Sequence, residues 1–266
     1  MAEPRLSFHV HTEGTGPYVF MVHGMLSSRL QWMLNLDEIS RVARPVVFEL
    51  WGHGRSPAPD EDRWYDVDAY LEQFDAVRQQ LGVRQVLLCG QSLGAALTLR
   101  YSALFPENVT AQVFTNSVSG ISAPLSLDPA PERSTLIAAL ESRDRGVLSS
   151  LPFHPGRARR LPAGVREQLV READSCDPRA IAKIMQITGP QLSVASELFR
   201  VKCPTLLVNG AREVAFQGLR DRVPEMIEGC EVVDLDAGHA VNIEAPVGFN
   251  RAVTQFFARI GDDGAS

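Results

Sequence analysis

Residues 86–101 read VLLCGQSLGAALTLRY, and the fold follows from how this stretch is interpreted. An apolar run of strand length leads into the turn GQS, and a run with helical spacing follows. Gly90 and Gly94 flank Ser92, which removes the side chains that would collide across a strand-to-helix reversal. The pattern predicts Ser92 at a strained bend, with its hydroxyl above the strand ends. Because short motifs recur by chance, an incidental serine in a glycine turn is the alternative that the rest of the chain must exclude.

Apolar runs of strand length alternate with helix-length stretches along most of the chain. This alternation is typical of a mostly parallel central sheet with helices on both faces, so the sequence predicts the α/β class. Strands are predicted at 18–22, 45–50, 85–90, 111–116, 204–210 and 231–236, with an edge strand at 6–13. Helices are predicted at 66–81, 92–105 and 246–260.

The alternation breaks once, between about Ser117 and Val201, where no strand is predicted. Helices separated by Pro- and Gly-containing turns are expected there at 131–151, 164–176 and 178–189. Ligands of open parallel sheets bind beyond the carboxyl ends of the strands, where an inserted helical segment would lie as a lid. We therefore predict a core domain of residues 1–117 and 201–266 and a helical cap, inserted between two strands, of residues 118–200.

Bulk properties exclude several classes of protein. The chain of 266 residues is long enough for one domain with an insertion, and its net charge of −6 argues against a nucleic-acid partner. No run approaches the roughly 20 apolar residues that span a bilayer, and the first residues do not resemble a secretory signal. Four cysteines lack the spacing of a disulfide framework or zinc site. We expect a cytoplasmic monomer or homodimer that needs no metal or other cofactor and acts on a small molecule.

A serine hydroxyl needs a general base, and two histidines follow Ser92 in the chain. His239 comes directly after the last predicted strand, on a loop that emerges at the same rim as the bend at Ser92. His154 lies in the predicted cap and would move with it. His239 is therefore the better candidate for the base.

A neutral imidazole needs a carboxylate that fixes its tautomer and stabilises the imidazolium. Glu213 occupies the loop after the strand at 204–210 and is the first candidate. Asp236, three residues before His239, and Asp221, predicted in the following helix, are the alternatives.

Two backbone amides are candidates for stabilising an oxyanion. The amide of Leu93 lies at a predicted helix N-terminus, next to Ser92. The second is the amide of Met25, because Gly24 lets the loop after an early strand turn inward. His23 and His53 adjoin glycine turns and are interpreted as structural.

Five motifs in order make the chain resemble the α/β-hydrolase superfamily, in its capped branch of esterases, lactonases, haloperoxidase-like enzymes and carbon-carbon bond hydrolases. They are HGM (23–25), ELWGHGRS (49–56), GQSLGA (90–95), VNGARE (208–213) and AGHAVNIEAP (237–246). Glu49 and Glu213 depart from the family pattern, which usually has aspartate at both places. The serine at position 92 argues against the dehalogenases and epoxide hydrolases of this branch. The resemblance implies that those enzymes have an aspartate nucleophile at this position.

The resemblance implies acyl transfer by a serine hydrolase. Ser92, deprotonated by His239 with Glu213 behind it, would attack a carboxylic ester, lactone or thioester while the amides of Met25 and Leu93 hold the oxyanion. Cleavage of a carbon-carbon bond in a ketone or diketone, acyl transfer to another acceptor, and elimination by a lyase are alternatives that use the same residues. A protein that kept the fold without turnover is a third possibility, which the presence of all these residues disfavours.

The sequence offers two indications of the substrate. Apolar residues that are candidates for lining the cleft are Trp32, Phe153, Met185 and Phe216, with Met25 and Trp51. Eight arginines lie from Arg133 to Arg171, against three acidic residues that interrupt them, Glu141, Asp144 and Glu167. A solvated helix face is the default explanation for such a run. An arginine that faced the cleft would instead bind a substrate carboxylate with two hydrogen bonds.

Overall fold

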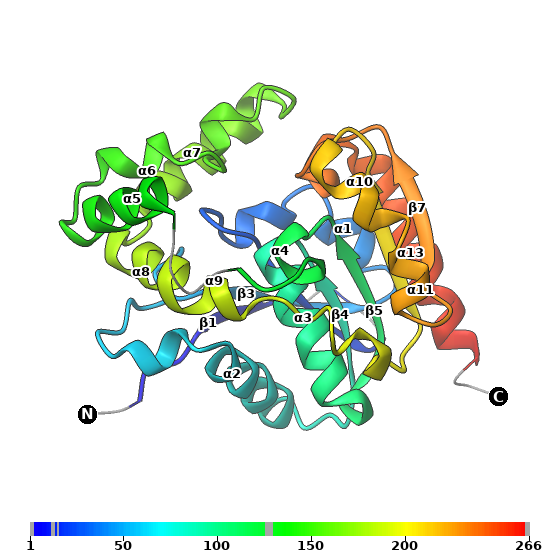
Figure 1. Ribbon diagram of the computed structural model, residues 1–266. Coiled ribbons are helices and arrows are strands. Elements are labelled where there is room, and N and C mark those ends of the chain that lie inside the picture. Colours follow the sequence, from blue (N-terminus) through cyan, green and yellow to red (C-terminus); the bar gives the residue numbers. More distant parts are fainter. Residues whose placement is uncertain (1–2, 12–13, 15, 126–129, 264–266) are drawn as a thin grey trace.

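The computed structural model describes residues 3–11, 14, 16–125 and 130–263, and a seven-stranded sheet runs through its centre (Figure 1). The strand order is β1-β3-β2-β4-β5-β6-β7. β1 pairs antiparallel with β3 at one edge, and all other pairs are parallel. The strands are β1 Ser7–Val10, β2 Tyr18–Val22, β3 Arg44–Glu49, β4 Val86–Gly90, β5 Val109–Thr115, β6 Thr205–Gly210 and β7 Glu231–Leu235. The predicted α/β fold with its antiparallel edge strand is confirmed, although residues 12–13 of that strand lie outside the described ranges.

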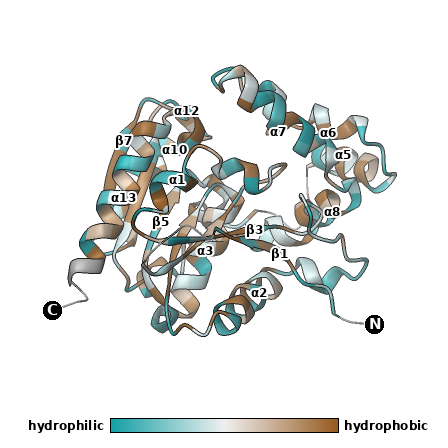
Figure 2. Cartoon of the chain, turned by 180° about the vertical axis from the view of Figure 1, so that it is seen from behind, coloured by the Kyte–Doolittle hydropathy of each residue, from teal (hydrophilic) through white to brown (hydrophobic). Residues whose placement is uncertain are grey.

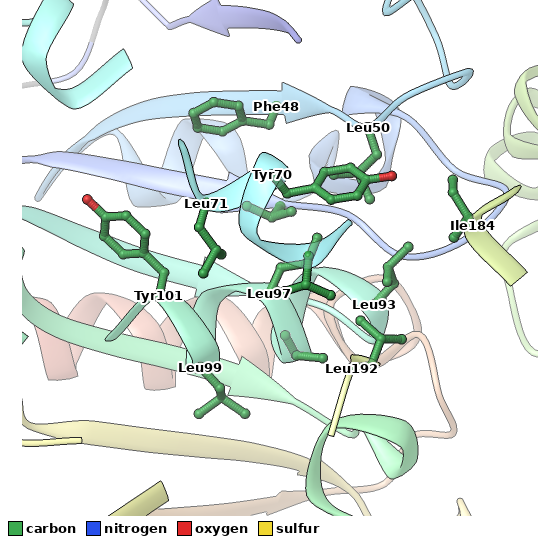
Figure 3. Close-up of a cluster of buried hydrophobic side chains, with 14 of the residues drawn as sticks. Phe48, Leu50, Tyr70, Leu71, Leu93, Leu97, Leu99, Tyr101, Ile184 and Leu192 are labelled. Atoms are coloured by element: carbon green, nitrogen blue, oxygen red, sulfur yellow. The ribbon is translucent and has the colours of Figure 1, made fainter. Parts of the chain in front are cut away.

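Helices cover both faces of the sheet, as the strand pattern predicted. On β2, Phe20 and Val22 belong to one buried cluster, whereas Val19 and Met21 belong to a second, because successive strand side chains point to opposite faces. The first cluster lies under α2 (Val67–Gln80) and α3 (Leu93–Leu104), and the second under α1 (Leu36–Ile39) and α13 (Pro246–Asp263). Figure 3 shows the first cluster, in which Phe48, Tyr70 and Leu97 come from β3, α2 and α3.

Short helices connect the remaining strands of the core, and the sequence analysis did not predict them, apart from a helix expected near Asp221 after the loop of Glu213. Runs of three to seven residues carry too few periods for a pattern to stand out. They are η1 Arg29–Trp32, η2 Asp62–Tyr65, η3 Pro106–Asn108, α10 Val214–Arg220, α11 Val223–Met226 and α12 Val241–Glu244.

The described part of the segment between β5 and β6 consists of helices joined by turns and contains no strand. It contains α4 Val118–Ile121, α5 Pro131–Glu141, α6 Gly146–Ser150, η4 Pro155–Arg157, α7 Ala163–Ser175, α8 Pro178–Lys183, the π-helix η5 Ile184–Thr188, α9 Gly189–Gln191 and η6 Leu198–Arg200. The prediction of a single helix at 131–151 is wrong, because a turn separates α5 from α6. Arg143 has a positive φ of 64° there, and the carboxylate of Asp144 accepts a hydrogen bond from the amide of Gly146. Asp side chains that bond nearby backbone amides favour turns over helix continuation.

The second half of this segment is fastened to the core. The amide of Asp177 donates to the carbonyl of Gly52 (2.9 Å), and a Cβ on Gly52 would lie 2.2 Å from Cβ of Ala180 on α8. The hydroxyl of Thr188 donates to the carbonyl of Tyr65 (2.6 Å). α5, α6 and α7 lie together on the side of the molecule away from α13, which both views show (Figures 1 and 2). α7 also packs on the core, because its Leu169 belongs to one buried cluster with Ile243 of α12. The division at 118–200 stays a prediction.

None of the helices within the described ranges is long and apolar enough to cross a membrane.

Candidate active site

Ser92 lies in a strained turn between β4 and α3. Its φ of 55° and ψ of −113° are unusual for a residue with a side chain. A Cβ on Gly94 would lie 2.1 Å from the carbonyl oxygen of Val22, and one on Gly90 would lie 2.6 Å from Cα of Ala95. The turn therefore requires glycine at both positions, as the sequence predicted. Such strain clusters at functional sites and persists where the surrounding structure enforces it.

The register of the sheet brings the loop after β2 to this turn. Val22, the last residue of β2, pairs with Gly90, the last residue of β4. A Cβ on Gly24 would lie 2.9 Å from Cβ of Ser92, so the loop approaches the serine as closely as backbone allows. In the described part of the chain, the amides of Met25 and Leu93 donate to no protein acceptor. Both amides are thus available to an oxyanion.

Two buried histidines brace the loop that carries Met25. The amide of Leu50 donates to Nε2 of His23, and the amide of Leu26 donates to Nε2 of His53, each at 3.1 Å. Nδ1 of each ring therefore carries the hydrogen and donates to a backbone carbonyl, of Gly24 from His23 and of a neighbouring residue from His53. Burial lowers the pKa of His23 to about 3, with the nearby His53 adding to the effect. Burial likewise lowers the pKa of His53 to about 4. Both rings are therefore neutral at pH 7 and hold the loop in place through hydrogen bonds to its backbone.

His239 and Glu213 form a hydrogen-bonded pair at the other side of the turn. Nδ1 of His239 donates to Oε1 of Glu213 over 2.9 Å. Their loops follow β7 and β6, which are neighbours in the sheet. A Cβ on Gly210 would lie 2.0 Å from the carbonyl oxygen of Gly238, so the two loops touch. The side chain of Asn116 holds Gly210 by accepting from its amide (2.9 Å) and donating to its carbonyl (3.1 Å).

The other two candidate acids are engaged elsewhere. Asp236 pairs with Arg212, whose hydrogen bond lowers the pKa of the aspartate, and its side chain is 72% exposed. Asp221 is equally exposed and pairs with Arg220 at 3.0 Å. Glu213, in contrast, is largely buried, and its Oε2 has no hydrogen-bond partner in the described residues. With few donors to neutralise it, the charge of Glu213 remains available to stabilise an imidazolium.

Ser92, His239 and Glu213 line one cavity of about 800 Å³, together with Met25 and Leu93. Because Nδ1 of His239 holds the hydrogen bonded to Glu213, Nε2 is the nitrogen left to act as a base. No hydrogen bond joins the Ser92 hydroxyl to His239 in the described part of the structure. Catalytic hydrogen bonds often become short only when substrate binds.

The wall of the cavity contains some of the apolar residues expected from sequence. Phe153 and Met185 lie in the lining, as does Met25. Residues that sequence reasoning missed also line it, among them Leu125, Ile184 and Leu192 from the segment between β5 and β6.

Trp32 and Phe216 are not in the lining, so their assignment to substrate binding is wrong. Trp32 is fully buried with the second cluster, where its ring lies 6.3 Å from that of Phe249. Phe216 is fully buried in the first cluster, and so is Trp51, whose ring lies 6.1 Å from that of Trp64. Large apolar side chains near a site motif are ordinary core residues when they point away from the rim.

His154 also lines the cavity, but both of its ring nitrogens are bonded to residues of the segment between β5 and β6. The amide of Gly156 donates to Nδ1, and Nε2 donates to Asp174, each at 3.2 Å. With neither nitrogen free, His154 has no lone pair for a serine.

Glu244 supports the loop of His239, and sequence analysis missed it although it lies within the motif AGHAVNIEAP. Its side chain is 7% exposed. Oε2 accepts hydrogen bonds from the amide of Gly238 (2.8 Å) and from Nε of Arg160 (3.0 Å). Arg160 belongs to the predicted cap, so this pair connects the cap to the residue next to His239.

Two of the eight arginines between Arg133 and Arg171 line the cavity, namely Arg133 and Arg157. Within the described ranges, no group of three or more His, Cys, Asp or Glu residues is arranged to hold a metal ion.

Comparisons with known proteins agree with the fold. The model of the alpha/beta hydrolase family matches residues 19–252. The chain is 24% identical over 250 residues to a Bacillus subtilis (strain 168) protein named putative 2-succinyl-6-hydroxy-2,4-cyclohexadiene-1-carboxylate synthase, covering 91% of this chain and 90% of that protein. The enol-lactonase of Burkholderia xenovorans LB400 superposes with a TM-score of 0.79 at 18% identity, over 95% of this chain and 96% of the other. A thermophilic esterase of Thermogutta terrifontis gives 0.79 at 20% identity, over 96% and 94%.

Proposed function

Because the chain belongs to the alpha/beta hydrolase family, we propose that it is a serine hydrolase of small or medium carboxylic esters, lactones or thioesters. One observation carries the proposal. The strained Ser92 shares a cavity with the hydrogen-bonded pair of His239 and Glu213. Two backbone amides that have no acceptor among the described residues lie in the same cavity. This is the set of groups that acyl transfer requires: a nucleophile, a base with its carboxylate, and donors for the oxyanion.

The proposed reaction has two halves. In the first, Nε2 of His239 takes the proton of the Ser92 hydroxyl while Oγ of Ser92 bonds to the carbonyl carbon of the substrate. The amides of Met25 and Leu93 hold the resulting oxyanion, and its collapse expels the alcohol or thiol, which receives the proton from His239. In the second, water gives a proton to His239 and its oxygen attacks the acyl carbon. His239 then gives that proton to the departing Ser92 oxygen, which frees the acid and restores the hydroxyl. A single oxyanion donor of this kind is typically worth about 3 kcal/mol in the transition state.

We further propose that residues 118–200 act as a cap that sets which molecules reach Ser92. Several residues of the cavity wall come from this segment, including Phe153, Met185 and Leu192. An apolar wall opposite the nucleophile favours a compact substrate with apolar character over a polymer.

A second candidate is cleavage of a carbon-carbon bond or elimination by the same residues. The relative from Bacillus subtilis is named as a synthase, and a structural neighbour as an enol-lactonase. Both names fit chemistry at or next to a carbonyl or its enol. The ester reaction remains the first choice because it uses each of the groups on the rim without a further one.

A panel of substrates tests the proposal. We expect turnover of p-nitrophenyl esters of short and medium chains, or of simple lactones, and a loss of about 10⁴-fold or more in Ser92→Ala. Turnover of vinylogous diketones without any ester or lactone hydrolysis would favour the second candidate. A folded wild-type protein inert toward all three classes would refute the serine-hydrolase assignment.

A further inference from the structure

The cavity contains an unusual arrangement of charge. Among the described residues that line it, four carry a formal charge: Arg133, Arg157, Glu213 and Glu244. The rest of the wall is mostly apolar, so each charge acts in a medium that screens it less than water does. The sign of the ligand charge that the cavity can bind therefore depends on the partners of these four side chains.

Both carboxylates have partners already. Glu213 accepts the hydrogen bond of His239 at 2.9 Å. Glu244 pairs with Arg160 at 3.0 Å and accepts a backbone amide as well. A cationic ligand would therefore have to compete with Arg160 for Glu244, and with the imidazolium that the proposed reaction forms on His239 for Glu213.

Within the described ranges, the two guanidinium groups bond to backbone carbonyls and not to carboxylates. Arg133 is half-buried, and its Nη2 donates to the carbonyl of Met185. Arg157 lines the cavity from η4 and is exposed to solvent, and its Nη2 donates to the carbonyl of Ser150 (3.0 Å). In the described ranges neither arginine forms an ion pair with a carboxylate. A carbonyl fixes one nitrogen but leaves the positive charge and the remaining N–H donors unmatched.

The hydrogen bond of Arg133 also connects it to the region of the nucleophile. Met185 lies in the π-helix η5, next to Ile184. Ile184 belongs to the same buried cluster as Leu93, the neighbour of Ser92, and Figure 3 draws both side chains in this cluster. π-Helices are rare and frequently occur at functional sites. Arg133 is thus bonded to a segment that lines the same cavity as Ser92.

The other arginines of the same run provide a comparison. Arg143, Arg159 and Arg171 are exposed and do not line the cavity. Arg145 is also exposed and bonds to two carbonyls at the end of α7. Exposure to solvent accounts for these four, of which Arg171 lies on α7 and the others lie in turns, but it does not account for the two that line the cavity.

We propose, building on the proposed function, that the substrate carries a carboxylate group which Arg133 binds, with Arg157 as a second cation at the rim. The guanidinium fork matches the planar carboxylate and forms two parallel hydrogen bonds with it. The scissile carbonyl lies at Ser92, and an apolar stretch of the substrate spans the wall between them. Because the protein carries a net charge of −6, which repels anions, an anionic ligand needs these nearby positive charges to bind in the cavity.

Matched pairs of substrates test this inference. Mono-p-nitrophenyl esters of succinic, glutaric and adipic acid carry a free carboxylate, and their methyl esters are neutral counterparts of nearly the same shape. We expect wild type to prefer one charged member over its neutral partner by about 10- to 100-fold in kcat/KM, the range of a charge-assisted hydrogen bond in an apolar site. This ratio should fall to about one in Arg133→Gln and recover in part in Arg133→Lys.

Arg171→Gln is the matched control. It removes the same charge from the same cap segment, but Arg171 does not line the cavity, so the preference of wild type should persist. Equal rates for both members of every pair in wild type would overturn the inference. So would a preference that survives in Arg133→Gln. Should that variant fail to fold, the wild-type ratio and Arg157→Gln, expected to show a smaller preference, decide the matter.

Calorimetry separates this inference from the proposed function. Monomethyl adipate is titrated into Ser92→Ala, which binds but does not turn over, with dimethyl adipate as the neutral comparison. Binding of the monoacid that is lost in Ser92→Ala/Arg133→Gln supports the carboxylate site even if no ester proves to be a substrate. Hydrolysis of neutral esters without carboxylate preference and without monoacid binding leaves the serine hydrolase standing and refutes the carboxylate site.

Discussion

The rim of the core and the segment between β5 and β6, which we propose to be a cap, shape one cavity by different means. On the rim, backbone atoms set the geometry: Gly24 and Gly94 lie so close to Ser92 and β2 that a single added carbon would collide. In the cap, side chains such as Phe153 and Met185 form the wall, and Phe153 is 38% exposed. Backbone contacts permit few substitutions, whereas a wall of side chains permits many.

This difference assigns a separate task to each region. Under the proposed function, the rim holds the groups whose spacing must be kept for bond making and breaking, and the proposed cap presents groups that meet the rest of the substrate. Changes at the rim should therefore lower turnover of every substrate alike. Changes in the cap should alter the preference among substrates.

The largest effect is expected from the carboxylate behind the base. Glu213→Gln keeps an acceptor for Nδ1 of His239 but removes the charge that stabilises the imidazolium, so kcat should fall by about 10² to 10⁴-fold. Thermal melting should change little, since Glu213 is at the rim of the core. Steady-state kinetics with the best ester of the panel measure the loss.

Asp236→Asn is the control for that variant, because Asp236 is exposed and pairs with Arg212 rather than with His239. Its kcat should stay within about threefold of wild type. If the loss occurs in Asp236→Asn or Asp221→Asn while Glu213→Gln remains active, the assignment of the acid is wrong.

Acid should weaken the rim through its two neutral histidines. The pKa values of His23 and His53 in the folded protein are about 3 and about 4, below the ordinary value of 6.5. Below pH 6.5 the two histidines bind protons in the unfolded chain but stay neutral in the folded protein. The contribution of the neutral histidines to the free energy of unfolding is therefore complete above pH 6.5 and is lost as the pH falls toward 4. At pH 5, which is 1.5 units below 6.5, each histidine should cost about 2 kcal/mol.

Melting temperature measured from pH 8 to pH 5 tests this expectation. His53→Gln should be less stable at pH 8 and should lose about half of the pH dependence. A wild-type profile that stays flat between pH 7 and pH 5 would contradict the neutral, buried state of the two rings.

A smaller effect compares one glycine from each region. Gly94→Ala would place a carbon against the carbonyl of Val22 and should destabilise the fold by about 3 kcal/mol, with loss of turnover. Gly164→Ala, at the start of α7 in the cap, meets nothing within 4 Å and should stabilise by about 0.5 to 1 kcal/mol. Chemical denaturation of both variants measures the contrast, and similar values would remove the distinction between rim and cap.

The smallest effect is expected at the contact between cap and rim. Arg160→Gln removes the ion pair to Glu244, which holds the amide beside His239, and should lower kcat about three- to fivefold with little change in KM. Arg160→Lys should restore part of the rate, and Arg159→Gln, at an exposed neighbour, should have no effect. An effect on KM alone would show that Arg160 acts on the substrate and not on the histidine loop.

Much of the rim could be predicted from the sequence. Strands β2 to β7 have apolar runs bounded by turns, and the glycines around Ser92 have a steric role that can be read without coordinates. The position of Glu213 followed from chain order, because parallel strands end at the same edge. The pairing of Glu213 with His239 itself needed the structure, since Asp236 and Asp221 fitted the order nearly as well.

The cap and the cavity wall could be predicted less well. Hydrophobicity does not tell whether a large side chain faces a cavity or a neighbouring ring, so Trp32 and Phe216 were misplaced. The break after α5 depends on the local turn at Asp144, which has no periodic signal. The importance of Glu244 depends on Arg160, 84 positions earlier, and no local pattern contains such a contact.

Labelling with a fluorophosphonate tests the central claim most directly, because the reagent reacts with a serine only where a base and an oxyanion site activate it. We predict rapid modification of wild type on the peptide that contains Ser92, much slower modification of His239→Ala, and none of Ser92→Ala. An unmodified wild-type protein, or equal modification of Ser92→Ala, would contradict the account.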